Sequence, residues 1–317
     1  MFQFIADLIT YQIFRLSTDS QLASAVNFFF YDVLKILFLI FTVVTVIAFI
    51  RSFFNPEKFK QRMSKLRWGS GNITAAIFGA VTPFCSCSSI PLFIGFLEAR
   101  IPTGIAFSFL ITSPLVNEVA FVIMGGLFGW RLAFLYALSG IALGAIGGFI
   151  IGSLKMEKEI ILENAEGRKL ENTMPKTLKG KLRFSLRFGW WTFKRLFLYI
   201  IGGVAIGAAI HGYVPQEFFI NTIGRYQILS VPIAAIVGIP IYAGCSTLVP
   251  IIFSITASGV PLGTSLAFMM AIAGLSLPEG VMLKRVISLK LLATFFGLVA
   301  IGIIIIGYLF NAIEIIR

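Results

Sequence analysis

The chain alternates long uncharged apolar stretches with short charged segments. Asp, Glu, Lys and Arg are absent from residues 68–97, 132–154, 226–278 and 291–313. A transmembrane helix needs about 20 consecutive apolar residues, whereas a strand of a membrane barrel needs about 10 residues of alternating polarity. The pattern therefore predicts an all-α polytopic membrane protein.

Proline, glycine and hydroxyl positions repeat between two parts of the chain. Residues 82–104 recur in residues 239–263, and each copy is followed by a second polar break, at 113–118 and at 276–279. Internal repetition of this kind is typical of transporters built from two related halves. The positions that match at one constant offset are Ser88 with Thr247, Pro91 with Pro250, Pro102 with Pro261, Gly104 with Gly263 and Phe109 with Phe268.

Each copy predicts a long helix, a hairpin, a broken helix and a continuous helix. The limbs of the first hairpin would each be about 14 to 16 Å long, or half the thickness of the hydrocarbon core. Such short limbs are typical of a re-entrant hairpin, and the hydroxyl residues just before Pro91 and Pro250 predict the start of each returning limb. The predicted layout is a span at 31–54, a hairpin at 72–97, a broken span at 101–128 and a span at 130–154, then a span at 188–212, a hairpin at 227–257, a broken span at 261–283 and a span at 288–311.

The distribution of basic residues favours re-entrant hairpins. With both hairpins re-entrant, 21 of the 26 Lys and Arg residues fall on one side of the membrane and four on the other, and Lys35 lies within the first predicted span. The positive-inside rule assigns the basic side to the cytoplasm. Each half then crosses the membrane an odd number of times, which predicts two inverted repeats with both termini outside.

The charged segment between the two copies defines the expected domains. The first apolar stretch, residues 33–54, lacks a small-residue cleavage site and therefore predicts a retained helix. The predicted parts are an N-terminal interfacial segment at 1–30, a first transmembrane repeat at 31–154, a charged cytoplasmic linker at 155–187 and a second transmembrane repeat at 188–317.

Composition agrees with a membrane protein. Of 317 residues, 58% are hydrophobic and 13% are charged, and the mean hydropathy is +0.94. These values exclude a water-soluble globule, a disordered chain and a disulfide-stapled scaffold. The net charge of +12 lies between the apolar segments, so it indicates membrane orientation and no nucleic-acid partner.

All three cysteines of the chain fall at the predicted hairpin tips. Thiolates bind soft ions such as Cu(I), Zn(II) or trivalent arsenic, which makes the tips candidate substrate or metal ligands. Cysteine can also serve as a small apolar residue in a tight turn, and that interpretation stays open. A structural zinc site is disfavoured, because the chain has one His and the first two cysteines are separated by one residue. The candidate substrate-binding residues are Cys85, Cys87, Cys245, Ser86, Ser88, Ser89, Ser246, Thr247, Ser113 and Asn117, and the three cysteines are the candidate metal ligands.

Two acidic residues, Glu118 and Glu279, fall in the second polar breaks. An intramembrane carboxylate typically marks an ion or proton path, so both are candidates for proton coupling. Asn117 would add an uncapped amide beside Glu118. A structural alternative exists for Glu279, because Ser276 three residues before it completes the pattern of a capping box.

Two motifs resemble a known family. Residues 82–91, Thr-Pro-Phe-Cys-Ser-Cys-Ser-Ser-Ile-Pro, and residues 112–118, Thr-Ser-Pro-Leu-Val-Asn-Glu, are similar to the signature of the predicted-permease family that includes the organoarsenical exporter ArsP and the YraQ proteins. The resemblance covers nearly the whole chain. It implies a multi-pass inner-membrane permease and, for the arsenic members, arsenic resistance through efflux of trivalent organoarsenicals.

These patterns together favour a secondary-active exporter of a small thiophilic solute, which works by alternating access of a central site. A transporter of Cu or Zn ions or of another small solute is the first alternative. A membrane thiol-disulfide oxidoreductase and a non-transporting subunit of a permease complex are alternatives of another class. We expect no enzyme activity and no cofactor, and the expected partners are the substrate, the lipid bilayer and either a second copy or a partner subunit.

Overall fold

The computed structural model describes residues 2–17, 20–51, 69–82, 86–98, 101–161, 177–213, 229–241, 245–257, 259–284 and 286–315. Within these ranges the regular structure is helical, apart from an isolated antiparallel β-bridge between Ile160 and Ile287. The all-α class predicted from the apolar pattern is confirmed.

The helices follow the order predicted from the sequence. The predicted half-length limbs are helices of 12 and 13 residues in the first copy and of 9 and 13 residues in the second. The elements are α1 (Phe2–Asp7), the π-helical η1 (Leu8–Ile13), α2 (Gln21–Arg51), α4 (Ser70–Val81), α5 (Ser86–Glu98), α6 (Thr103–Leu115), α7 (Glu118–Phe128), α8 (Trp130–Ser153), the 3-10 turn η2 (Met156–Glu159), α10 (Leu178–Tyr213), α12 (Ser230–Gly238), α13 (Cys245–Ala257), α14 (Leu262–Gly274), α15 (Leu277–Leu283) and α16 (Leu289–Ile315).

The returning limbs start earlier than predicted. Helix α5 begins at Ser86 and α13 begins at Cys245, so Pro91 and Pro250 lie inside the helices and not in their first turns. A proline there removes one backbone N–H from the ladder. The hydroxyl residues of both limbs thus belong to the helices themselves.

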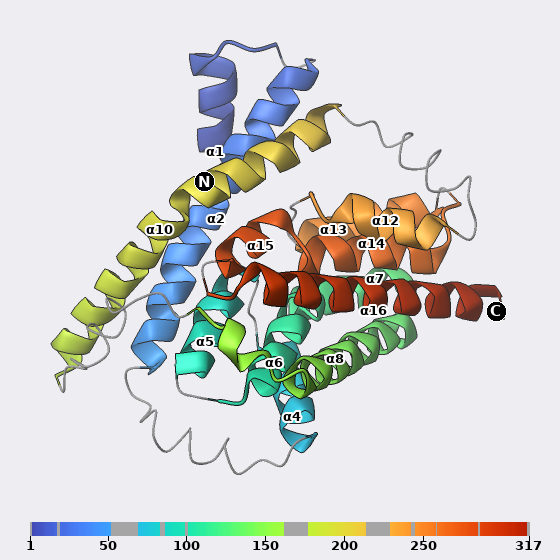
Figure 1. The fold of residues 1–317 in the computed structure, drawn as a ribbon. Coiled ribbons are helices and arrows are strands. Elements are labelled where there is room, and N and C mark those ends of the chain that lie inside the picture. Colours follow the sequence, from blue (N-terminus) through green and yellow to red (C-terminus); the bar gives the residue numbers. More distant parts are fainter. Residues whose placement is uncertain are drawn as a thin grey trace. The chain divides into compact units, whose positions relative to one another are not determined.

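The chain divides into two compact units, Met1–Asn55 with Leu162–Pro215 and Pro56–Ile161 with Gln216–Arg317. In the first unit α2 packs along α10 (Figure 1). The ring of Phe41 contacts those of Trp190 and Phe193, each at 6.4 Å between centroids. A Cβ on Gly189 would collide with the Thr45 hydroxyl, so the helices approach closely here.

The second unit contains the helices with the clearest membrane-spanning character. Among the described residues, three segments are long and apolar enough to cross a membrane: Trp130–Ser153, Leu262–Leu283 and Leu289–Ile313. The pair Thr103–Leu115 and Glu118–Phe128, bent by 44°, would form a fourth. Burial of 82% of the Leu262–Leu283 window, against 39% and 33% for the other two, makes α14 a core helix.

Helices α6 and α14 lie at the centre of this unit. Every residue of α6 is buried, and residues 263–274 of α14 are buried as well. Helix α6 packs with α4, α5 and α8, and α14 packs with α12, α13 and α16. The two series of helices therefore have the same order and the same packing partners.

Equivalent residues make equivalent contacts in the two series. The offset of 159, which is 247 minus 88, relates Gly79 to Gly238 and Phe109 to Phe268. A Cβ on Gly79 would lie 3.0 Å from the Phe109 carbonyl oxygen, and a Cβ on Gly238 would lie 3.1 Å from that of Phe268. Small residues at these positions let α4 approach α6 and let α12 approach α14.

Contacts between the two series involve residues that are themselves 159 positions apart. The Leu115 side chain packs against Gly274, and the Leu143 side chain packs against Gly302. One turn along, Leu298 packs against Gly147, so α8 and α16 run antiparallel (Figure 1).

Candidate transport site

The predicted thiol ligands lie at the starts of α5 and α13. Cys87 is in the first turn of α5 and Cys245 is the first residue of α13, where the structure describes the backbone alone. Cys85 lies outside the described residues. A thiolate site at these tips stays a prediction, as do side-chain roles for Ser86, Ser88, Ser246 and Thr247, while the Ser89 side chain is fully buried.

Each returning limb packs on the helix that follows the break of the other series. Helix α5 contacts α15, and α13 contacts α7. The rings of Phe128 and Phe253 meet edge to face at 5.2 Å. The limbs that carry the cysteines thus adjoin the two breaks that carry Glu118 and Glu279.

The first break, between α6 and α7, is closed by hydrogen bonds from inside the protein. The carboxamide oxygen of Asn117 accepts from the backbone N–H groups of Val119 (2.9 Å) and Ala120 (3.3 Å). The buried Tyr136 hydroxyl donates to the Leu115 carbonyl oxygen at 2.9 Å. Asn117 is therefore the N-cap of α7, and the expectation that its amide is uncapped was wrong.

The other predicted polar groups of the first break lie within or beside it. Ser113 is fully buried one turn before the break. Glu118 is half-buried, and its Oε2 atom has no hydrogen-bond partner among the described residues. One carboxylate oxygen of Glu118 is therefore buried although the residue as a whole is partly exposed.

The second break, between α14 and α15, lacks such closure. Ser276 is at the N-cap of α15, but its hydroxyl makes no cap hydrogen bond. Glu279 is fully buried, and neither of its carboxylate oxygens has a partner in the described part of the chain. The capping box that the sequence allowed is not formed, because both of its side chains are unpaired.

Sequence differences explain the contrast between the breaks. The offset of 159 places Phe295 where the first series has Tyr136, so the hydroxyl that binds the Leu115 carbonyl has no counterpart. The offset also places Ser276 where the first series has the capping Asn117, and it places Pro278, which has no N–H, where the first series has Val119, whose N–H donates to Asn117. These differences are present in the sequence, but they lie outside the matched motifs of residues 82–104 and 239–263.

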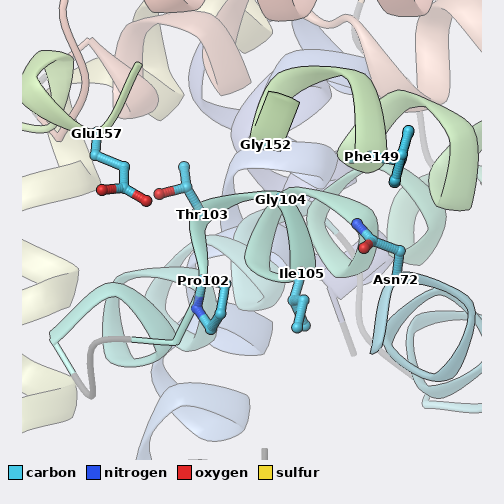
Figure 2. Close-up of a pocket in the computed structure, with 9 residues that line it drawn as sticks. Asn72, Pro102, Thr103, Gly104, Ile105, Phe149, Gly152 and Glu157 are labelled. Atoms are coloured by element: carbon cyan, nitrogen blue, oxygen red, sulfur yellow. The ribbon is translucent and has the colours of Figure 1, made fainter. Parts of the chain in front are cut away.

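A cavity lies at the start of α6, away from the predicted site residues. It measures about 20 Å³, which holds one water molecule. Figure 2 shows the Glu157 carboxylate and the Thr103 hydroxyl pointing toward one another at one end, while Asn72 and Phe149 lie at the other. The side chain of Asn72 donates to the Ser108 hydroxyl at 2.9 Å, so this amide belongs to the helix packing.

In the second series a side chain closes the equivalent helix start. The Asn311 carboxamide oxygen accepts from the backbone N–H groups of Gly263 (2.7 Å) and Thr264 (3.2 Å). The position equivalent to Asn311 in the first series is Gly152, which lines the cavity. The sequence analysis missed this capping residue.

The described residues hold no cluster of three or more His, Cys, Asp or Glu side chains that could bind a metal ion. The three cysteine side chains are not among these described side chains. Apart from Ser89, the polar side chains of the candidate site that the structure does describe are those at the two helix breaks.

Comparison with known proteins places the chain in one family. Residues 21–312 match a family model, ArsP_1, described as a predicted permease. UPF0718 protein MJ0584 of Methanocaldococcus jannaschii is 25% identical over 74% of this chain and 80% of its own. A Streptococcus mutans protein named as a two-component membrane permease complex subunit is 23% identical over 81% of this chain and 85% of its own. UPF0718 protein YraQ of Escherichia coli is 23% identical over 75% of this chain and 66% of its own. No solved structure matches the chain.

Proposed function

Because this chain belongs to the predicted-permease family ArsP_1, a family of membrane transport proteins, we propose that it is a secondary-active exporter of a small thiophilic solute such as a trivalent organoarsenical. The observation that carries the proposal is the position of the cysteines. All three lie at or beside the starts of α5 and α13, two short apolar helices that adjoin the breaks. Thiolates in such a place would select a soft solute.

We further propose that the two series of helices are inverted repeats. A residue that contacts its own equivalent lies on a two-fold axis, and the pairs Leu115 with Gly274 and Leu143 with Gly302 support such an axis. Equivalent helices that run antiparallel, as α8 and α16 do, are related by an axis perpendicular to their length. For membrane-spanning helices such an axis lies in the membrane plane.

Transport would follow alternating access between the two halves. The solute would bind between the hairpin tips, and movement of the limbs against the break helices would open it to one side at a time. Glu118 and Glu279 are our candidates for proton coupling, because each is a carboxylate at a helix break. The inner membrane is the proposed location, with both termini outside.

A partner subunit is a second part of the proposal. The Streptococcus mutans relative is named as a subunit of a two-component permease complex. Transport by this chain would then require that its partner be present in the same membrane.

Uptake by everted membrane vesicles tests the proposal. Methylarsenite, arsenite, Cu(I), Zn(II) and an oxyanion would be offered with and without an ion gradient. We expect accumulation of one soft species by the wild type and loss of it when Cys85 and Cys87 are replaced by Ser. Full transport in that double variant would refute the thiolate site, and no accumulation of any species would favour the redox or subunit alternatives.

A further inference from the structure

The two breaks differ in how their polar atoms are satisfied. In the first break the Asn117 side chain caps α7, and the Tyr136 hydroxyl binds the Leu115 carbonyl, while one carboxylate oxygen of Glu118 is buried without a partner among the described residues. In the second break the Ser276 hydroxyl and both oxygens of Glu279 are buried without a partner among the described residues. Buried polar atoms in native proteins are nearly always paired, so the second break is suited to a group that the described residues do not themselves supply.

Two backbone carbonyls at the end of α14 lack their intrahelical donors. The intrahelical donor for the Ala273 carbonyl would be the N–H of Leu277, which instead donates to the Ile239 carbonyl at 3.1 Å. The donor for Gly274 would be Pro278, which has no N–H. The end of α14 therefore presents carbonyl oxygens within a few residues of the Ser276 hydroxyl and the Glu279 carboxylate.

A set of oxygen atoms around one carboxylate favours a hard cation. A proton would neutralise Glu279, but one O–H group serves one acceptor and would leave the other oxygens unpaired. A metal cation contacts several oxygens at once, and cations bind at the C-terminal ends of broken helices in transporters. No basic side chain of the described chain pairs with Glu279, and its single negative charge matches a monovalent cation.

We propose that the α14–α15 break is a binding site for a hard monovalent cation of the sodium type, held by the Glu279 carboxylate, the Ser276 hydroxyl and the carbonyls at the end of α14. Asn117 and Tyr136 satisfy backbone groups of the α6–α7 break, where we expect no Na⁺ site. The inference rests on the proposed function, because the Na⁺ gradient across the membrane would drive export. It assigns Na⁺, and not a proton, as the ion that Glu279 binds.

Binding of ²²Na⁺ to the purified full-length protein in lipid nanodiscs tests the site directly. We expect saturable binding by the wild type, loss of binding in Glu279→Gln, and affinity weaker by about tenfold or more in Ser276→Ala. Phe295→Tyr should also weaken binding, because it supplies the second break with the hydroxyl that Tyr136 gives the first. Glu157→Gln, at an exposed carboxylate outside both breaks, is the control and should bind Na⁺ as the wild type does.

Absence of saturable binding to the wild type would overturn the site, as would Glu279→Gln binding Na⁺ with wild-type affinity. Monodisperse size-exclusion profiles show whether each variant is folded. Solute uptake into proteoliposomes separates the two proposals. Uptake driven by a pH gradient and indifferent to Na⁺ would refute the cation site and leave the exporter standing. Saturable Na⁺ binding without solute uptake under any gradient would refute the exporter and leave the site.

Discussion

Close backbone contact is the clearest feature of the second unit at the scale of single residues. Gly104 of α6 faces Gly148 and Gly152 of α8, and Gly263 of α14 faces Gly307 and Asn311 of α16. Membrane helices associate through small residues because lipid offers no hydrophobic drive for their contact. The repeated glycine pairs thus hold each broken helix against the continuous helix of its own series.

The Gly104 contact predicts a stability effect. A Cβ at Gly104 would lie 2.6 Å from the Gly148 carbonyl oxygen, and backbone there cannot move aside without shifting α8. We expect Gly104→Ala to lower the free energy of unfolding by about 1 to 3 kcal/mol. Thermal unfolding of the purified protein measures this loss of stability. Gly126→Ala is the control, because no atom lies within 4 Å of its Cβ position; equal melting temperatures for the two variants would contradict the contact.

At the scale of the elements, the two series of helices share their order and packing but differ in the side chains that cap their helix starts and breaks. The start of α14 is capped by Asn311, 48 residues away from Gly263. The start of α6 has no such side chain and faces a cavity instead. The N-terminus of α14 is therefore held by a side chain of α16, whereas the N-terminus of α6 has no side-chain cap.

The Asn311 cap can be tested by removing its acceptor. Asn311→Ala leaves two backbone N–H groups of α14 without their acceptor, and we expect a loss of about 1 kcal/mol. The melting temperature in detergent should fall accordingly. Asn311→Asp keeps an oxygen in place and should retain most of the stability. A cap role would be wrong if both variants melted together with the wild type.

At the scale of the whole chain, charge and helix order constrain the orientation in the membrane. Re-entrant hairpins place 21 basic residues on one side and four on the other, which predicts a cytoplasmic linker and external termini. The four short helices of the second unit have lengths compatible with such hairpins. Orientation follows from the number of crossings in each half.

Reporter fusions test this orientation. Green fluorescent protein fused after residue 170 should fluoresce, because the linker is expected in the cytoplasm. Alkaline phosphatase fused after Arg317 should be active, because the C-terminus is expected outside. Fusion at Gly129, between α7 and α8, serves as a control on the external side. A phosphatase-inactive C-terminus with a fluorescent linker would mean that one half crosses an even number of times.

The sequence by itself determined the helical class, the order of the helices and the places where they break. Uncharged length defines a membrane helix, and proline with hydroxyl residues interrupts one, so both are local properties. The match of Pro102 and Gly104 with Pro261 and Gly263 also revealed the repetition. The starts of α5 and α13 were predicted one to three residues late, because helix ends depend on neighbours as well as on caps.

Only the tertiary structure decided which polar groups are satisfied. The Leu115 carbonyl is bound by Tyr136, 21 residues away, and the amide groups at the start of α14 are bound by Asn311. The pattern Ser276-x-x-Glu279 allowed a capping box, yet both side chains are buried and have no hydrogen-bond partner among the described residues. A hydrogen bond needs a donor brought within about 3 Å by another element. The local sequence shows where a helix breaks, whereas tertiary packing decides which hydrogen-bond partners the polar groups of that break find.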